Sequence, residues 1–352
     1  MKKEKGGIKL LVVILLLLIL IAGGLLLARK LLDKPQNETS ANLLNNSEID
    51  SQVPEKEPVT FAGNERPIAF MLDNNINAMP QAGLLEADII YEMIVEGGET
   101  RLMAVMKNKN PEKIGPLRSA RHYYLDYALE NDAIYVHFGQ SPQAKSDITT
   151  LGISDINGIY ESSTYFWRVS SRYAPHNVIT SMEKMEKLIE KKGFRTTTTK
   201  KNVLNYVAEE FNLENGEEAL EITIPYSTVN TVKYTYDPQT KTYTRYSRNK
   251  KQVDWETEKN IQVKNIIITK CKNTTLNDGS NAGRQTLSNI GTLDGYYITN
   301  GKIIPITCTK TSRAGQTVYQ DLDGNEINVN DGKTFIQICP IDSKITFGVE
   351  ED

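Results

Sequence analysis

Hydrophobic residues are concentrated at the start of the chain, where residues 10–28 form nineteen consecutive positions without a charged side chain. A helix needs roughly 20 apolar residues to cross a bilayer. Four lysines and one acidic residue precede this run, and such a basic end stays in the cytoplasm. The pattern predicts a cytoplasmic flank at 1–9, a transmembrane helix at 10–28, and a single-pass plasma-membrane protein whose bulk is extracytoplasmic.

A cleaved signal peptide is the alternative interpretation of this segment. Ala22-Gly23-Gly24 offers the small residues that signal peptidases require. Three leucines and then Arg29-Lys30 follow these residues, which favours a continuous span. We therefore expect the anchor to be retained.

The segment after the apolar run is polar. In the rest of the chain, hydrophobic and polar residues alternate with the spacings typical of strands and helices. Residues 33–59 are rich in Asn, Glu, Ser and Pro and contain too few apolar side chains for a core, so residues 29–59 are predicted to be a linker. The rest is long enough for two domains. We expect a mixed α/β domain at 60–215 and a mainly β domain at 216–347.

Three runs in the first domain have the composition of strands: 66–73, 88–95 and 100–106. Gly97-Gly98 separates the last two and predicts a hairpin with a two-residue turn. In the register that follows, Glu92 lies opposite Met103, and Glu96 pairs with Glu99. This places Glu92, Glu96, Glu99 and Arg101 on one face.

Two interpretations of that charged face stay open. It is either an outward surface on which Arg101 contributes little to stability, or one wall of a cleft lined by carboxylates. In the second case Glu92, Glu96 and Glu99 are candidate catalytic residues and Arg101 is a candidate ligand-binding residue.

The segment GPLRSARHYYLDYALE (115–130) predicts a helix from about Ala120, with Ser119 as its cap. At 100° per residue, Arg118, Arg121 and His122 share a face with Leu125, Ala128 and Leu129. Because the leucines must be buried, the basic groups should line a recess. They bind either an anionic ligand or a carboxylate of the hairpin.

AIYVHF (133–138) predicts a strand, after which Ser141 and Pro142 predict the start of another helix. Strand ends followed by helix starts bind ligands in open α/β sheets, which makes His137, Gln140 and Ser141 candidates for ligand binding.

Further candidates come from two segments later in the same domain. His176 and Asn177 precede a predicted helix whose start has capping-box spacing. Arg168 ends the FWR segment (166–168) and joins them as a candidate ligand-binding residue.

The second half shows turn signals between alternating runs, namely Asp237-Pro238, Asn300-Gly301 and Asp323-Gly324. Its aromatic residues are either platforms for stacking sugars or ordinary cross-strand partners. The three cysteines lie in apolar runs, which favours buried thiols.

The net charge of the chain limits the classes of partner that it can bind. Residues 1–34 carry seven basic and two acidic side chains, so the net charge of −3 leaves −8 on residues 35–352. An acidic body argues against nucleic acid as a partner. No spacing of His or Cys fits a metal, and we expect neither a metal nor a cofactor.

The chain also resembles a known family. RPIAFMLDNN, PQAGLLEADIIYE, VEGGETR, GPLRSARHYY, AIYVHFGQSPQA, FWR and APHNVIT, in this order, resemble the N-terminal domain of the YerB-like family of bacterial envelope lipoproteins. VKYTYD, YTRY, VDWET, GYYITNGKIIPITCTK and YQDLDGNEINVNDGKTFIQICP resemble its C-terminal domain. The likeness covers nearly all of residues 60–347.

The resemblance implies an exported protein but no reaction, because the activity of the family is undefined. Its members typically carry a lipobox cysteine, and this chain has an apolar run instead, so its attachment to the membrane differs. We expect a binding or adaptor protein of the cell envelope whose partners are wall fragments or envelope proteins. The alternative is a hydrolase of wall glycan or peptide that uses paired glutamates.

Overall fold

The computed structural model describes residues 56–348, which belong to one compact unit. The predicted anchor at 10–28 and most of the predicted linker lie outside these described residues. Between residues 56 and 348, no helix combines the length and the apolar character needed to span a membrane.

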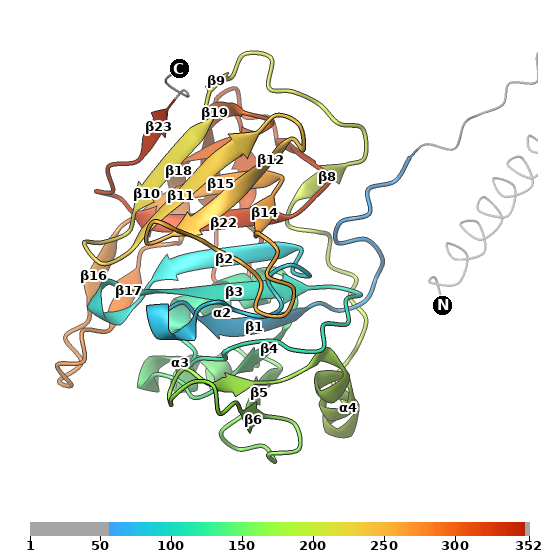
Figure 1. Cartoon of the computed structure of the whole chain (residues 1–352), viewed down its shortest axis with the longest axis vertical. Helices are drawn as coiled ribbons and strands as arrows, with labels where there is room; N and C mark the ends of the chain where they lie inside the picture. The colour runs from blue at the N-terminus through green and yellow to red at the C-terminus, as the bar shows by residue number, and fades with distance from the viewer. Residues whose placement is uncertain (1–55, 349–352) are drawn as a thin grey trace, which may run out of the picture. The chain divides into compact units, whose positions relative to one another are not determined.

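Most of the regular structure is β (Figure 1). In sheet order, the large sheet contains β20 (Val318–Gln320), β19 (Lys302–Lys310), β18 (Gly291–Thr299), β15 (Asn265–Cys271), β22 (Thr334–Pro340), β2 (Ile89–Ile94), β3 (Thr100–Met106), β1 (Ile68–Asp73), β4 (Ile134–His137) and β5 (Asp155–Asn157), with β9 (Glu217–Glu218) beside β19.

A second sheet contains β13 (Lys250–Lys251), β12 (Thr242–Ser247), β11 (Thr231–Asp237), β10 (Glu221–Pro225) and β23 (Thr346–Gly348), with β14 (Gln262–Val263) beside β12. Three short pairs complete the strands: β16 (Asn273–Thr275) with β17 (Gln285–Leu287), β21 (Asn328–Asn330) with β8 (Asn205–Val207), and β6 (Trp167–Arg168) with β7 (Val178–Ile179).

The α-helices of residues 56–348 are few and short: α2 (His122–Glu130), α3 (Pro142–Thr150) and α4 (Met182–Lys192), beside the 3₁₀ turns η1 (Ile76–Ala78) and η2 (Glu96–Gly98). The predicted α/β class of the N-terminal half is therefore wrong. Parallel pairing of β1, β4 and β5 around two helices does occur there. Antiparallel strands form the rest of that half's sheet, and the C-terminal half adds only strands.

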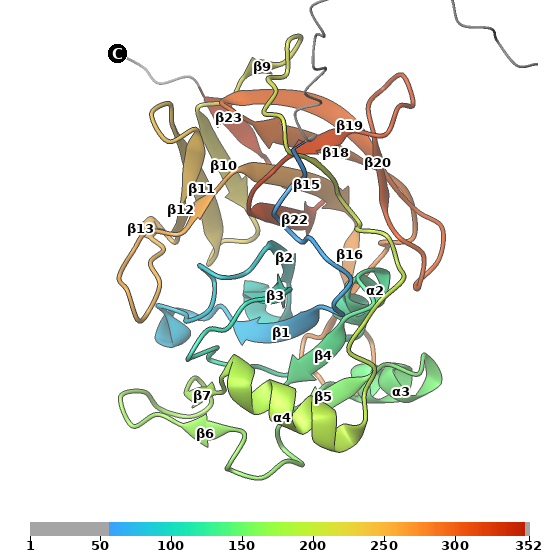
Figure 2. The same cartoon turned by 90° about the vertical axis from the view of Figure 1, so that its right-hand side faces the viewer.

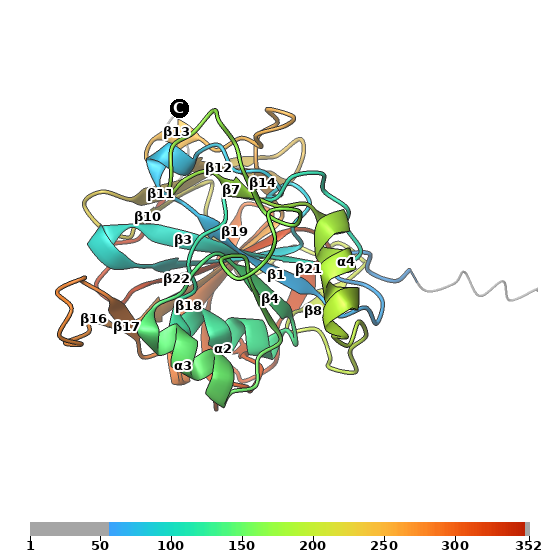
Figure 3. The ribbon, with the colours of Figure 1, turned by 90° about the horizontal axis from the view of Figure 1, so that it is seen from below.

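Strands from both halves of the chain pair in the large sheet. β2 runs parallel to β22, with Glu92 beside Gln337. The second sheet covers one face of this junction, and Figures 1 and 2 show the two layers. Tyr234 of β11 packs against Phe335 of β22 at 6.1 Å between ring centroids. Helices α2 and α3 lie on the opposite face (Figure 3). The core therefore continues from one half into the other.

The β2–β3 hairpin differs from its predicted register by one residue. Its loop has three residues, because the Val95 N–H donates to the Glu99 carbonyl at 2.7 Å. Gly97 and Gly98 both have positive φ, which glycine adopts without strain. Glu92 therefore lies opposite Leu102. A shift of one residue moves every side chain to the other face.

The predicted common face of Glu92 and Arg101 is consequently wrong. Arg101 pairs with Met93, on the face covered by α2, where the Tyr124 hydroxyl binds the Arg101 carbonyl. Glu92 points to the other face, toward the second sheet.

Local predictions of turns and caps had mixed outcomes. The Ser141 hydroxyl accepts from the Ala144 N–H at 3.1 Å, so the predicted start of α3 is confirmed. The Asn300-Gly301 turn between β18 and β19 is also confirmed. Ser119 does not cap α2, because Arg121 occupies that position without a side-chain cap.

The three cysteines are free and buried, as predicted. Burial raises the pKa of each thiol to about 12. They are therefore protonated and unreactive at neutral pH.

Candidate functional site

A recess of about 280 Å³ lies where β1 and β2 end, β3 begins and the chain approaches α2. Its lining contains six of the candidate residues that the sequence suggested. The lining residues are Asp73, Asn75, Val95, Glu96, Glu99, Thr100, Arg101, Arg118, Arg121, His176, Ala282 and Arg284.

A larger hollow of about 930 Å³ lies beside β8. Its charged side chains, such as Glu209 and Glu210, are exposed. Glu210 already binds Lys241 and Lys264. Buried charges that face an opening indicate a site better than exposed, paired ones, so the recess is the stronger candidate.

Arg121 and Glu96 form a two-pronged ion pair on one wall of the recess. Arg121 Nε and Nη2 lie 2.6 and 2.8 Å from the two carboxylate oxygens of Glu96. Burial alone would raise the pKa of Glu96, but the hydrogen bonds and charge of Arg121 outweigh it and lower the pKa. Glu96 is therefore ionised at neutral pH.

Arg101 lies behind this pair and has no carboxylate of its own. Its Nη2 is 3.9 Å from Glu96, whose oxygens Arg121 already binds. Among residues 56–348, the hydrogen-bond partner of the Arg101 guanidinium is the Ser119 carbonyl, to which Nη1 donates. Burial lowers the pKa of Arg101 to about 10, and the positive charges of Arg121 and Arg118 act in the same direction.

Asp73, at the end of β1, holds a second group of charges. Its Oδ2 lies 3.2 Å from Arg118 Nε and 2.8 Å from His176 Nδ1. Its Oδ1 accepts from the Asn75 N–H at 3.0 Å. The Asp73 side chain is 5% exposed, and these contacts hold it in the wall of the recess.

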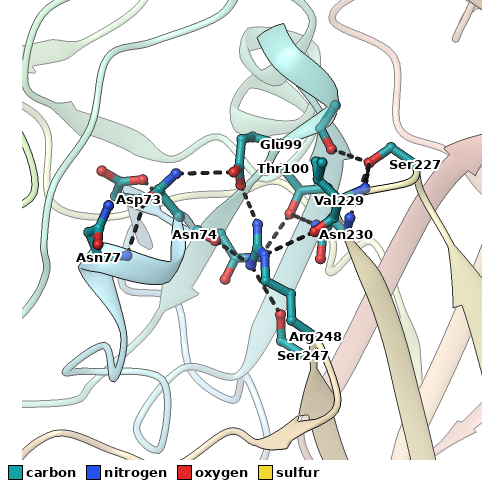
Figure 4. Close-up of polar contacts among 12 residues, drawn as sticks. Asp73, Asn74, Asn77, Glu99, Thr100, Ser227, Val229, Asn230, Ser247 and Arg248 are labelled. Atoms are coloured by element: carbon teal, nitrogen blue, oxygen red, sulfur yellow. Dashed lines mark hydrogen bonds and ion pairs between the residues drawn. The ribbon is translucent and has the colours of Figure 1, made fainter.

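Glu99 forms the third side, and Figure 4 shows its contacts. Asn75 Nδ2 donates to Glu99 Oε1 at 3.0 Å, and Arg248 binds Oε2. Arg248 also donates to the Asn74 carbonyl at 2.9 Å, which links this wall to the second sheet. Burial raises the pKa of Glu99, and the negative charge of Asp73 adds to the effect.

Around Arg101 the recess carries more positive than negative charge. Since Arg248 binds Glu99, three guanidinium groups share two carboxylates. The groups that share are Arg101, Arg118 and Arg121, with Asp73 and Glu96. Guanidinium forks bind carboxylate and phosphate oxygens in pairs, so the arrangement can hold one further anionic group.

Glu92 lies outside the recess, in a fully buried cluster between the sheets. Its Oε2 is 2.5 Å from Arg245 Nη2, and both side chains are 0% exposed. Its Oε1 accepts from Asn74 at 3.1 Å and from Thr100 at 2.7 Å. Glu92 is therefore separated from Glu96 by the sheet.

Three more candidates around α2 and β4 also lie elsewhere. His122 Nε2 is 3.2 Å from the Thr286 hydroxyl on β17. His137 is buried, with Nδ1 2.8 Å from the Gly139 carbonyl. Gln140 accepts from Asn157 at 3.1 Å.

The remaining candidates have local contacts. Ser141 caps α3. Arg168 Nη1 donates to Asn177 Oδ1 at 2.6 Å, and Asn177 Nδ2 donates to the Arg172 carbonyl at 3.0 Å. Arg168 and Asn177 therefore brace the loop that carries His176.

Sequence reasoning missed Asp73, Asn75, Arg248 and Arg284. An acidic residue that ends an apolar strand and precedes Asn74-Asn75 was an available signal for the first two. Arg248 and Arg284 come from the C-terminal half, and no feature of the sequence around them indicates that they approach the recess. Arg284 is bound by Asp278 of its own hairpin at 2.6 Å.

No group of three or more His, Cys, Asp or Glu side chains suited to a metal is present within the described residues 56–348.

Two family models match: the N-terminal domain of a protein of unknown function (DUF3048) at residues 55–195, and its C-terminal domain at 222–336. A Bacillus subtilis protein named "Putative lipoprotein YerB" is 30% identical over 278 residues, covering 78% of this chain and 81% of that protein.

A solved structure is also similar. The crystal structure of YerB protein from Bacillus subtilis matches with a TM-score of 0.72 and 30% identity, covering 80% of this chain and 94% of the other.

Proposed function

The chain belongs to the YerB-like (DUF3048) family, and from this premise we propose that it is an envelope protein that binds a singly charged anionic group in the recess. The group is a phosphate diester or a carboxylate carried by a wall fragment or by another envelope protein. The chain itself would be anchored in the plasma membrane by residues 10–28 and extracytoplasmic beyond them.

Two observations support this location. The related Bacillus subtilis protein has the name "Putative lipoprotein YerB", and lipoproteins are attached to membranes. The apolar run at 10–28 follows a basic segment, the arrangement expected of an anchor with its body exported.

Arg101 carries the argument for anion binding. A buried guanidinium without a carboxylate of its own is costly, and two neighbouring guanidinium groups increase that cost. An anion beside Arg101, Arg118 and Arg121 would offset it. An acidic ligand therefore has a favourable place here, although the exported body as a whole is acidic.

Paired glutamates fit this site poorly as a hydrolytic pair. Glu92 is fully buried on the other face of the sheet, and Arg121 keeps Glu96 ionised. Burial raises the pKa of Glu99, as a general acid requires, but Asn75 and Arg248 bind its two carboxylate oxygens. The binding role is therefore better supported than the paired-glutamate mechanism.

The proposal is tested by melting the purified full chain in increasing inorganic phosphate or acetate at constant ionic strength. A ligand of the folded state stabilises it by about 2.7 kcal/mol at a hundredfold excess over Kd. We expect a saturable rise in Tm with at least one of the two anions. Arg118→Ala should remove it.

Arg195→Ala is the matched control, since it removes a guanidinium from an ion pair with Asp132 outside the recess. It should keep the response. The absence of a saturable rise with either anion, or an equal rise in Arg118→Ala, would contradict anion binding in the recess.

A further inference from the structure

His176 is oriented as a group that accepts protons. Its Nδ1 lies 2.8 Å from Asp73 Oδ2, and an ionised carboxylate accepts hydrogen bonds but donates none. In the neutral ring the proton is therefore on Nδ1, and Nε2 has a free lone pair. Nε2 forms no hydrogen bond to any residue between 56 and 348, and the ring lines the recess.

Asp73 is held so that it can keep this orientation. The Asn75 N–H fixes one oxygen, and Arg118 shares the other with the imidazole. A buried carboxylate that binds the Nδ1 proton of a histidine selects the tautomer and stabilises the imidazolium once Nε2 takes up a proton. Asp73 is therefore a positioning residue for His176.

The loop that carries His176 is braced on both sides. Arg172 donates to the carbonyls of Ala78 and Pro80 at 2.6 Å and stacks 3.9 Å from the Trp255 ring. The contact of Arg168 with Asn177 holds the other end. Such support limits movement of the imidazole, and general-base catalysis requires a base that is held in a fixed position.

We propose that His176 is the general base for hydrolysis of a phosphodiester held by Arg118 and Arg121, with Asp73 positioning its imidazole. This rests on the proposed function and extends it to a reaction. A phosphodiester fits because its anionic oxygens and its electrophilic phosphorus are one group. Arginines that bind the anion therefore also bring the reacting atom near His176.

The step is balanced without any other reactant. A water oxygen forms a bond to phosphorus while one P–O ester bond breaks. The water proton goes to His176 Nε2, and the leaving oxygen takes a proton from solvent. The products are a phosphate monoester and an alcohol, and His176 then returns its proton to water. Negative charge on the phosphoryl oxygens grows during attack, so the guanidinium groups stabilise the transition state more than the substrate.

The experiment measures release of p-nitrophenolate from bis(p-nitrophenyl) phosphate by the full chain, in buffer with EDTA to suppress contaminating metal-dependent phosphodiesterases. The Asn side chain can keep a donor to Asp73 while lacking Nε2, so His176→Asn is the informative variant. We expect it to lose turnover by about 100-fold to 10,000-fold, the usual contribution of a general base. Its melting temperature and its response to inorganic phosphate should stay close to those of the unmodified chain.

A second variant keeps the test decisive. His176→Gly opens space for a free imidazole, and we expect added imidazole to restore part of its turnover. Arg195→Gln, outside the recess, should keep full turnover.

No turnover by the unmodified chain, or equal turnover in His176→Asn, would overturn the proposal. Either result together with a saturable response to phosphate would leave anion binding in place, so the two proposals fail separately.

Discussion

Two ion clusters only four residues apart in the chain, around Glu92 and around Glu96, differ in burial and in charge balance. Glu92 and Arg245 are fully buried, and Asn74 and Thr100 complete the hydrogen bonds of the carboxylate. Glu96 is 20% exposed and serves two arginines. The first cluster joins the two sheets, whereas the second faces an opening.

The length of the hairpin loop determines which face of the sheet each charged residue occupies, and therefore whether it lies between the sheets or in the recess. One additional loop residue places Glu92 on the face covered by the second sheet and Arg101 on the other. A fully buried pair contributes mainly through the cost of separating its charges. An accessible group with surplus positive charge can exchange partners with a ligand. Stability and binding should therefore respond to different substitutions.

The largest effect is expected from Glu92→Ala. It leaves the Arg245 guanidinium buried without a counter-charge, at a cost of about 3 to 5 kcal/mol. Urea denaturation of the full chain measures this as a lower free energy of unfolding. The double variant Glu92→Met with Arg245→Met should recover most of the loss, since no buried charge remains. A single-variant loss below about 1 kcal/mol would contradict the burial argument.

Arg121→Ala should have a smaller effect on stability and a larger one on binding. Glu96 stays partly solvated and keeps Arg101 at 3.9 Å, so we expect a loss of about 1 to 2 kcal/mol. Phosphate binding should weaken at least tenfold, since one fork of the recess is removed. The same urea and melting measurements provide both values. A fall in stability with unchanged phosphate binding would assign Arg121 to structure alone.

The smallest effect concerns acid stability, where Glu96 and Glu99 should act in opposite directions. The folded pKa of Glu96 is below its ordinary value of 4.5, so its stabilisation is present above 4.5 and lost as the pH falls through the folded pKa. The folded pKa of Glu99 is raised, so its stabilisation is present below 4.5 and lost as the pH rises through the folded pKa.

Measurement of the free energy of unfolding as a function of pH distinguishes the contribution of Glu96 from that of Glu99. Glu96→Gln should make stability fall less steeply on acidification, and Glu99→Gln should make it fall more steeply. Parallel profiles for both variants would show that the two carboxyl groups share one environment.

Local signals in the sequence were sufficient for several elements. Ser141 followed by Pro142 determines the start of α3, and Asn300-Gly301 determines a hairpin, because each signal acts within a few residues. Gly97-Gly98 was ambiguous, since two glycines suit both a two-residue and a longer turn. The error of one residue exchanged the faces of Glu92 and Arg101.

Contacts between distant segments could not be predicted in this way. β2 pairs with β22, and Arg248 reaches Glu99, through packing of strands that lie far apart in the chain. Arg118 and Arg121 do line a recess, but the helical face predicted for them is wrong, since both precede His122, the first helical residue of α2. Its third predicted member, His122, lies against β17 instead.

The most direct test follows the Nε–H signals of individual arginines by ¹⁵N NMR while inorganic phosphate is added to the full chain. We expect the signals of Arg101, Arg118 and Arg121 to move together and to saturate, because these groups face the recess. The signal of Arg245 should stay in place, because that guanidinium is fully buried on the other face of the sheet. Recess signals that do not move, or that move no more than that of Arg245, would contradict anion binding at this site.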